Sequence, residues 1–371
     1  MESVDVCVRG TGAVGCALAL ALSRQGLRVA LQGDAHSAER KDDVRAFALN
    51  AGSVALLREL KVWDALPIDA RTAVHDMRIE GDAPGAELSF SAWSQGVEAL
   101  AWIVDAGELE RALGTAVSFA PHVRRAAGTA TVEAALLALA EGKDSPSRAL
   151  LKVAMPAQPY GQRAVAARLV AELPHAGLAR QWFRSPDVLA LLPFDRPRPE
   201  HSLALVWSLP DARADELMAM DEAAFIAALE DASALAAGRL RLESPRASWP
   251  LSLARAERIC GPGWALLGDA AHVVHPLAGQ GLNLGLADVR ALAEVLRERE
   301  PWRGLGDERL LQRYARARAG PTRAMGQLTD GLLQLFASEA PLVRELRNRG
   351  LSLVNALPPL KRLLASQALD S

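Results

Sequence analysis

The feature that most constrains the fold is a glycine-rich turn near the amino terminus, Gly10-Thr11-Gly12-Ala13-Val14-Gly15. It lies between a β-branched run at 4–8 and an Ala- and Leu-rich stretch at 17–25 that is typical of a helix buried against a sheet. A second strand is expected at 27–31. In such a unit Gly10 permits the tight turn, Gly12 lets a pyrophosphate approach the backbone, and Gly15 allows close helix packing. The chain therefore opens as a βαβ unit that favours dinucleotide binding, with a purely structural turn as the alternative.

The acidic residue that usually ends the second strand of this unit is displaced. The position expected to carry it is Gly33, with Gln32 before it and Asp34 after it. Asp34 is a candidate for a hydrogen bond to the adenosine ribose if the turn shifts by one residue. Such a shift usually turns a side chain to the other face, so a solvated loop aspartate is the alternative.

The rest of the chain predicts an α/β protein with an inserted sheet domain. A helix is expected over 51–66, and alternation of period two across 77–90 favours a hairpin. Apolar runs bounded by Pro, Asp and Arg are typical of a mostly antiparallel sheet, and they lie at 165–170, 188–192, 203–209 and 246–251. From 286 onward the pattern is helical, with interruptions expected at Pro321, Pro341 and Pro358-Pro359.

Composition excludes several classes of protein. The 42 basic and 44 acidic residues give a net charge of −2, which disfavours nucleic-acid binding because no global positive field exists. Three cysteines without paired spacing fit neither a disulfide framework nor a zinc site, so a reducing cytoplasm is expected. No run of about 18 apolar residues occurs, so neither a signal peptide nor a membrane span is expected.

A second motif follows an apolar strand near residue 266. Gly268 and Asp269 end that strand, and Gly279 and Gly281 precede a long helix running to about 297. Ligands bind at the carboxyl ends of strands in open α/β sheets, where Asp269 can accept a hydrogen bond from a ribose or ribityl hydroxyl. Its alternative role is to cap a turn. The glycines let backbone N–H groups and a helix amino terminus lie against a flat ring.

The stretch 268–288, GDAAHVVHPLAGQGLNLGLAD, resembles the second flavin motif of the FAD-dependent aromatic hydroxylases with the para-hydroxybenzoate hydroxylase fold. It is most similar to the ubiquinone-biosynthesis branch of that family. The likeness covers almost the whole chain, and its further matches lie at Arg45 with 48–53, 104–113, 160–162, 189–193, 206–207 and 346–361.

The resemblance implies a Rossmann-like FAD-binding domain over 1-72, 98-158 and 254-330, a substrate domain over 73-97 and 159-253, and a helical C-terminal segment over 331-371. Arg45 would contact the FAD phosphates or, alternatively, be a surface arginine. The implied cofactor-binding residues are Gly10, Gly12, Ala13, Val14, Gly15, Asp34, Arg45, Gly268, Asp269, Pro276, Gly279, Gly281, Leu282 and Asn283. Pro276, Gly279 and Gln280 are expected near the isoalloxazine, and no side chain is assigned as the catalyst.

The implied activity is that of an FAD-dependent monooxygenase that hydroxylates a phenolic ring with O₂ and NAD(P)H at the flavin C4a position. NAD(P)H would dock transiently, because the sequence holds a single GxGxxG. A polyprenylated ubiquinone precursor is the favoured substrate. The alternatives are a small soluble aromatic substrate, or a non-catalytic flavoprotein-like subunit of a quinone-biosynthesis complex.

Two departures from the family pattern bear on cofactor affinity. One is Gly33 in place of the acid, and the other is Glu141-Gly142 in place of an Asp-Gly pair that links FAD and NAD(P)H contacts in the family. A charged surface turn is the alternative for Glu141. His272 and His275 lack nearby Cys or carboxylate partners in the sequence, so no metal site is expected and both are interpreted as loop residues near the flavin.

Aromatic residues and the chain end complete the expectations. Trp182, Phe183, Trp207 and Trp249 are expected in the core rather than in a ligand wall, although some could face an aromatic substrate. Apolar residues recur at helical spacing across 342–357 with arginines among them. This pattern favours a helix packed on the FAD domain over a peripheral element at the inner membrane.

Overall fold

The computed structural model describes residues 4–33, 43–81, 85–128, 130–274 and 280–337. Its opening is the expected βαβ unit, in which α1 (Ala13–Arg24) connects β1 (Val4–Arg9) to β2 (Val29–Gln32) and these strands pair in parallel. The sheet that contains them runs in the order β16-β17-β9-β1-β2-β8. Its remaining strands are β8 (Val123–Ala126), β9 (Ala134–Leu139), β16 (Cys260–Gly261) and β17 (Trp264–Leu266).

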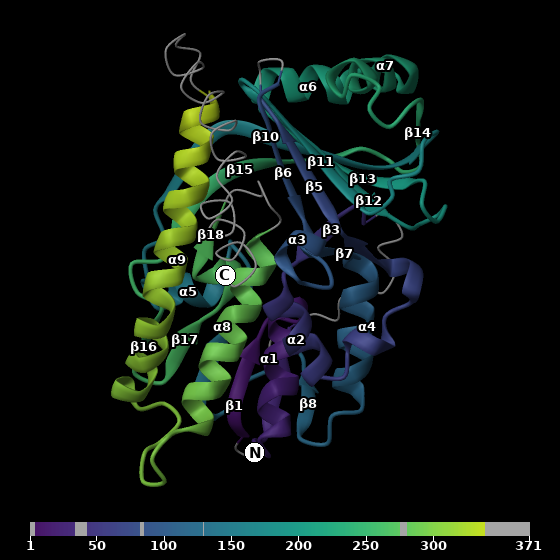
Figure 1. Cartoon of the computed structure of the whole chain (residues 1–371). Coiled ribbons are helices and arrows are strands. Elements are labelled where there is room, and N and C mark those ends of the chain that lie inside the picture. The colour runs from purple at the N-terminus through teal and green to yellow at the C-terminus, as the bar shows by residue number, and fades with distance from the viewer. Residues whose placement is uncertain (1–3, 34–42, 82–84, 129, 275–279, 338–371) are drawn as a thin grey trace.

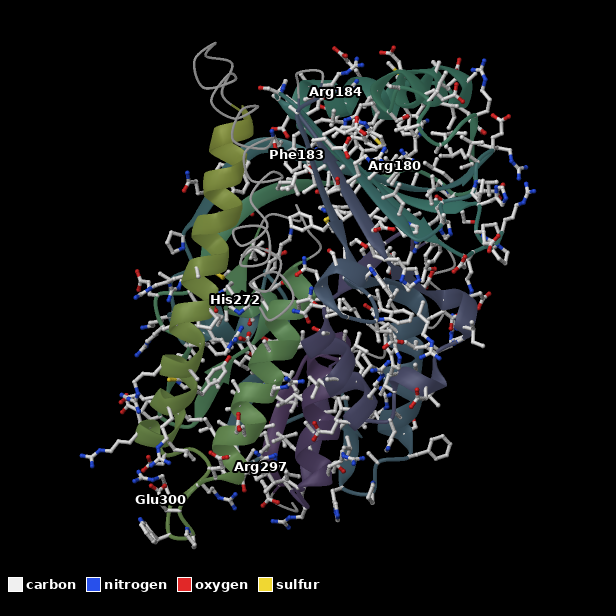
Figure 2. The ribbon with its side chains drawn as sticks, in the orientation of Figure 1. Arg180, Phe183, Arg184, His272, Arg297 and Glu300 are labelled. Atoms are coloured by element: carbon white, nitrogen blue, oxygen red, sulfur yellow. The ribbon has the colours of Figure 1, made fainter. Side chains whose placement is uncertain are left out.

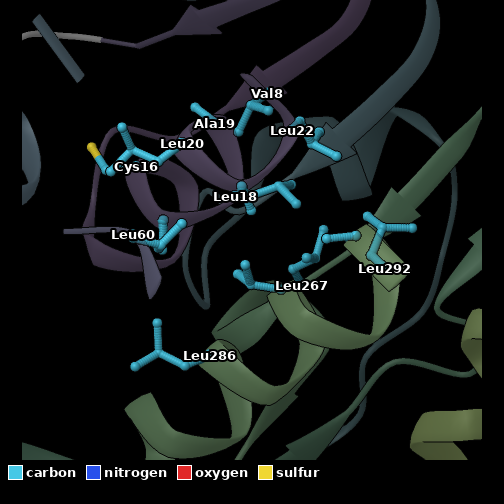
Figure 3. Packing of buried hydrophobic residues seen from close by; sticks show 14 of the residues in the cluster. Val8, Cys16, Leu18, Ala19, Leu20, Leu22, Leu60, Leu267, Leu286 and Leu292 are labelled. Atoms are coloured by element: carbon cyan, nitrogen blue, oxygen red, sulfur yellow. The ribbon is translucent and has the colours of Figure 1, made fainter. Parts of the chain in front are cut away.

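Helices pack around this mainly parallel sheet, which forms the lower part of the view in Figure 1. They are α2 (Ala51–Glu59), α4 (Ala106–Ser118), α8 (Gln280–Arg297) and α9 (Glu308–Ala337). The core lies where α1 meets α8, with Leu18 and Leu22 near Leu267 and Leu292 (Figure 3). Burying each such leucine contributes roughly 1.5–3 kcal/mol, so this contact fixes the two glycine-bearing segments relative to each other.

A small antiparallel sheet and several short helices join the two halves of the molecule. The sheet has the order β3-β7-β4, built from β3 (Ala46–Leu49), β4 (Arg71–Val74) and β7 (Ala101–Asp105). The short helices are η1 (Trp63–Ala65), η2 (Ile68–Ala70), α3 (Ala92–Gln95), α5 (Pro146–Leu150) and η3 (Gly268–Ala270). Asp105 caps α4 by accepting a hydrogen bond from the Glu108 backbone N–H at 2.9 Å, which explains why β7 passes directly into a helix.

The large sheet crosses the upper part of the view in Figure 1 in the order β18-β15-β10-β13-β12-β11-β5-β6, and β14 pairs with β10. Its strands are β5 (Asp76–Glu80), β6 (Glu87–Ser91), β10 (Ala157–Ala171), β11 (Leu178–Arg184), β12 (Asp187–Phe194), β13 (Ser202–Pro210), β14 (Leu240–Leu242), β15 (Ala247–Arg255) and β18 (His272–Val273). Helices α6 (Asp211–Ala219) and α7 (Glu222–Ala232) cover one face through buried Trp182, Trp207 and Phe225.

Most expected elements are present, and two of them differ from expectation. The helix expected over 51–66 ends at Glu59, because the chain turns at Lys61 with φ +62° before the short helix η1. The hairpin across 77–90 forms as β5 and β6, and all four apolar runs between 160 and 250 lie in strands. Pro321 does not interrupt the last helix, because α9 runs through it. Tertiary contacts outweigh the lost backbone hydrogen bond there, since Tyr314 and Arg318 anchor the helix just before the proline. The expectations for 338–371, including Pro341 and Pro358-Pro359, lie outside the described residues.

Candidate functional site

A cavity of about 1380 Å³ lies between the mainly parallel sheet and the large sheet. Its lower wall is formed by the glycine turn, the end of β2, the β3 segment and the start of α8, and its upper wall by β5, β11, β12, β13 and β15. Pockets for a single small ligand usually measure roughly 300–1,000 Å³. This cavity is therefore large enough for an extended cofactor and a second ligand beside it.

The three glycines of the turn serve different purposes. At Gly10, where φ is +109°, a Cβ would lie 2.1 Å from the Ala140 carbonyl oxygen, and at Gly15 a Cβ would lie 1.9 Å from the Gly10 carbonyl oxygen. At Gly12 a Cβ would meet nothing within 4 Å, and Gly12 lines the cavity with Ala13 and Val14. No side chain caps the amino terminus of α1 at Gly12, so its backbone N–H groups can bind an anion in the cavity.

The end of β2 carries no acid for a structural reason. The buried Gln32 side chain donates to the carbonyls of Ala127 and Gly128 at 3.1 Å and accepts from Arg9 Nε at 3.1 Å, so it ties β2 to neighbouring segments. Gly33 lines the cavity with φ +154°, at the edge of the region that favours glycine, and a Cβ there would lie 3.1 Å from Thr11 Cγ2. Asp34 lies outside the described residues.

Arg45 lines the cavity but is held by carboxylates. Its Nη2 donates to Asp43 Oδ2 at 2.6 Å and lies 3.4 Å from Glu110 Oε1. These partners raise the pKa of Arg45, chiefly through the hydrogen bond with Asp43. The sequence analysis missed Asp43 and Glu110, since nothing in their spacing indicates that both carboxylates meet one guanidinium.

Asp269 lines the cavity, and its side chain makes no hydrogen bond within the described residues. Burial among protein atoms raises the pKa of this carboxyl, and His272, Lys143 and Arg45 act in the opposite direction. The side chain is nevertheless accessible through the cavity itself. A carboxylate that is open to the cavity and has no partner among the described residues can accept hydrogen bonds from a ligand with hydroxyl donors, and a ribityl or ribose chain provides them.

A buried ionic network lies behind Asp269. Asp288 on α8 is fully buried and accepts hydrogen bonds from the Gly268 backbone N–H at 2.9 Å, from His272 Nε2 at 2.7 Å and from Arg318 Nε on α9 at 2.6 Å. Burial alone would raise the pKa of Asp288. The charges and hydrogen bonds of these partners outweigh burial, so the pKa is lowered overall. The network fixes the backbone of the turn that presents Asp269. The expectation that His272 is a loop residue without a carboxylate partner is wrong, since it begins β18 and bonds to Asp288 (Figure 2 labels His272).

The amino-terminal turn of α8 closes the cavity on one side. Gly281, Leu282 and Asn283 line it. Asn283 Oδ1 accepts from Ser53 Oγ at 2.7 Å and its Nδ2 donates to the Ala48 carbonyl at 2.8 Å, so it joins α8 to the β3–α2 connection. Gln280 begins α8, while His275, Pro276 and Gly279 lie outside the described residues.

Glu141 binds the start of the short helix α5, whose N-cap is Ser145, instead of forming an isolated surface turn. It accepts hydrogen bonds from Ser145 Oγ at 2.5 Å and Ser147 Oγ at 2.8 Å, and Ser147 Oγ in turn accepts one from Arg9 Nη1 at 2.9 Å. Glu141, Ser147 and Arg9 all line the cavity. The replacement of an aspartate by this longer acid is therefore compensated by its own hydrogen-bond partners.

The aromatic residues of the large sheet divide between its two faces. Trp182 and Trp207 are buried beneath α6 and α7, as expected for core residues. Phe183 and Trp249 instead line the cavity, which matches the alternative that some of these residues face a ligand.

These features together define a dinucleotide-dependent enzyme with a second ligand compartment. A family model described as "FAD binding domain" matches residues 103–329, more than half of the chain. The chain is 30% identical to ubiquinone hydroxylase UbiL of Rhodospirillum rubrum over 99% of this chain and 90% of that protein. It is also 30% identical to the 3-demethoxyubiquinol 3-hydroxylase of Escherichia coli over 99% of both, and 27% identical to the human mitochondrial ubiquinone biosynthesis monooxygenase COQ6 over 98% and 92%.

Solved structures agree on the fold. PqsL, a probable FAD-dependent monooxygenase from Pseudomonas aeruginosa, aligns with a TM-score of 0.77 at 22% identity over 94% of this chain and 99% of that chain. HpxO from Klebsiella pneumoniae, complexed with FAD and uric acid, aligns with a TM-score of 0.74 at 17% identity over 99% and 97%. The chain therefore belongs to the FAD-binding-domain family and is an FAD-dependent monooxygenase, a class for which NAD(P)H is the typical reductant. No helix in the described part of the chain is long and apolar enough to cross a bilayer.

Proposed function

We propose that this chain hydroxylates the aromatic ring of a polyprenylated ubiquinone precursor with O₂ and NAD(P)H. The observation that carries the proposal is a single continuous cavity that joins the glycine turn and Asp269 to the apolar face of the large sheet. Relatives that span nearly the whole chain are ubiquinone hydroxylases by name, which supports a quinone precursor over a small soluble aromatic substrate.

In this proposal the lower wall of the cavity holds FAD. The residues 10–15 and the amino terminus of α1 bind the pyrophosphate, Arg45 contacts a phosphate, and Asp269 accepts hydrogen bonds from the ribityl hydroxyls. Gly268 and residues 276–283 are proposed to contact the ring system, and Asp34 is proposed to bind the ribose at the adenosine end. When bound, FAD supplies the redox chemistry with O₂. The chain orients the substrate ring and excludes water from it.

In this proposal each of the two domains forms one wall of the cavity. The segments 1-72, 98-158 and 254-330 form the FAD domain, 73-97 and 159-253 the substrate domain, and 331-371 a helical carboxyl-terminal segment. Helix α9 runs across the boundary between 330 and 331, so this segment continues from the FAD domain. The apolar lining on the sheet side suits an aromatic ring and the first isoprene units of a tail.

Placement of the pyrophosphate is tested by Gly12→Ala. The new methyl group meets no protein atom within 4 Å, so the fold should be unaffected while the group occupies the pyrophosphate path. We expect FAD affinity of the apoprotein, measured by quenching of flavin fluorescence, to fall at least about tenfold. The matched control is Gly304→Ala. A Cβ at Gly304 also meets nothing within 4 Å, and Gly304 does not line the cavity. Equal FAD affinity in both variants and the wild type would refute the placement.

The activity is tested in a bacterial strain that lacks its own 3-demethoxyubiquinol or related ring hydroxylase. Quinone intermediates are identified by liquid chromatography with mass spectrometry, with and without this chain. Restored ubiquinone, together with a flavin spectrum and substrate-stimulated NAD(P)H oxidation of the purified protein, supports the proposal. A coloured, reducible protein that leaves the prenylated intermediate unchanged but oxidises a soluble phenol would favour the small-aromatic alternative. A colourless protein needed only for the integrity of other enzymes would favour the non-catalytic subunit.

We also propose peripheral contact with a membrane surface, because a polyprenyl tail partitions into the bilayer and the substrate has to be withdrawn from it. Leu150 on α5 lines the cavity and is 79% exposed, which supports an apolar rim at the opening. The stripe at 342–357 lies outside the described residues. Sedimentation of the holoenzyme with phosphatidylglycerol vesicles, compared with its Leu150→Ser variant, tests this. If the holoenzyme does not sediment with the vesicles, membrane contact is refuted, and a quinone-biosynthesis complex would have to deliver the prenylated substrate.

A further inference from the structure

The upper wall of the cavity is mainly apolar. Side chains that alternate along β5, β11 and β12 line it, while intervening ones on β11, β12 and β13 pack toward α6 and α7. Strand β13 contributes 204–206 and Ser208, and β15 contributes the consecutive residues 249–252. The apolar residues of this wall include Ile79, Phe183, Val188, Ala190, Val206 and Trp249. A ring and its hydrocarbon substituents fit such a surface without any specific orientation.

Gln181 interrupts this apolar surface. It lies on β11 between Arg180 and Trp182, which point to the opposite face, and its neighbours across the sheet are Ile79 on β5 and Ala190 on β12. Figure 2 marks Arg180 and Phe183, the residues just before and two after it on this strand. A polar side chain therefore stands between apolar neighbours on the cavity side of the strand.

The Gln181 amide has no hydrogen-bond partner among the described residues. The residue is only 7% exposed. The amide atoms are not among the fully buried side-chain atoms without a partner, so they are open to the cavity, where a polar group of a ligand can replace water.

Ser208 on β13 is a second polar residue on the cavity side of the large sheet. It is 3% exposed, lines the cavity, and its hydroxyl makes no hydrogen bond within the described residues. It pairs with Val188 on β12, so it lies two strands and two residues away from Gln181, or roughly 12 Å by strand spacing. The two polar groups therefore lie too far apart to bond each other and can contact different points of one ligand.

We propose that Gln181 sets the orientation of the substrate by hydrogen bonding to an oxygen substituent on its ring. The inference rests on the proposed function and adds a specificity residue to it. A primary amide both donates and accepts, so it can bind a phenol hydroxyl or a ring carbonyl. Ser208 offers a second, weaker polar contact. The ring without its oxygen would leave the amide unpaired, so the site discriminates against it.

The experiment measures binding to the oxidised holoenzyme by the change in flavin absorbance, with 4-hexylphenol and hexylbenzene as probes. The wild type should bind the phenol more tightly than the hydrocarbon. In Gln181→Met, which keeps the length of the side chain but removes the amide, we expect the preference for the phenol to fall about tenfold. Hexylbenzene affinity should stay equal or rise. The control is Gln158→Met, the same change at an exposed position on β10 that does not line the cavity.

Steady-state turnover gives a second readout, which should not change in this way if Gln181 only stabilised the fold. Gln181→Met should raise KM for 4-hexylphenol more than it lowers kcat, and the fraction of NAD(P)H oxidation that yields hydroxylated product should fall as the ring is held less well. Gln181→Asn, which keeps the amide on a shorter side chain, should restore part of the preference.

The outcomes separate this inference from the proposed function. A wild type that prefers the phenol and a Gln181→Met variant that prefers it equally would overturn the inference alone. Loss of the preference in Ser208→Ala but not in Gln181→Met would also overturn it. A wild type that binds FAD, responds to neither probe and hydroxylates no ring would overturn the proposed function and this inference together.

Discussion

Replacement of Asp288 by asparagine tests the buried network behind the Gly268–Ala270 turn. The carboxylate is fully buried, and Arg318 beside it has a side chain that is 8% exposed. Asp288→Asn keeps the shape and removes the charge, so the Arg318 guanidinium stays in the interior without its counter-ion. Breaking one partner of a buried pair costs about 3–5 kcal/mol, and the amide can keep the bond from Gly268, so we expect a loss of about 3 kcal/mol.

Urea unfolding followed by circular dichroism measures this loss as a lower midpoint at an unchanged slope. The matched control is Asp69→Asn, in which the carboxylate is 49% exposed and pairs with Arg196. It should cost less than about 1 kcal/mol, because exposed ion pairs are weak and Glu108 still holds Arg196. A loss below about 1 kcal/mol in Asp288→Asn would refute the argument that the network holds the turn.

The same network predicts a pH dependence. Since the pKa of Asp288 is lowered in the folded protein, its stabilising contribution is present above the unfolded value of about 4 and is lost as the pH falls through the folded value. The difference in free energy of unfolding between the wild type and Asp288→Asn should therefore shrink below pH 4. If this difference in free energy of unfolding stayed constant down to pH 3, the predicted direction of the pH dependence would be wrong.

Three further predictions concern single residues. Glu110→Gln removes one of the two carboxylates beside Arg45, so the FAD dissociation constant in fluorescence titration should fall about fivefold, and a rise would contradict the proposed phosphate contact. Burial raises the pKa of Asp187 to about 6, so the wild type should lose stability relative to Asp187→Asn as the pH rises from 4 to 6, and equal pH profiles in thermal melts would refute this. Gly285→Ala places a Cβ 2.6 Å from Val14 Cγ2, so it should lower the melting temperature, whereas Gly304→Ala should not.

Much of the fold could be predicted from the sequence because its elements have local signatures. The turn at 10–15, the apolar runs of the large sheet and the Gly268-Asp269 strand end are each encoded by neighbouring residues. The need for glycine also arises from nearby residues, since a Cβ at Gly15 would lie only 1.9 Å from the Gly10 carbonyl oxygen. The failure at Pro321 shows where local rules end, since distant contacts hold α9 across a residue that usually breaks a helix.

The sequence by itself determined that this chain has two glycine-bearing segments, a carboxylate at a strand end and a sheet rich in apolar residues. The tertiary structure alone decided which side chains meet. Asp288 joins Gly268, His272 and Arg318 across as many as 30 positions, Glu110 reaches Arg45, and Gln181 faces the cavity instead of solvent. The physical reason is that periodicity fixes the face of one strand or helix, whereas hydrogen bonds and charge pairs between elements depend on how those elements pack.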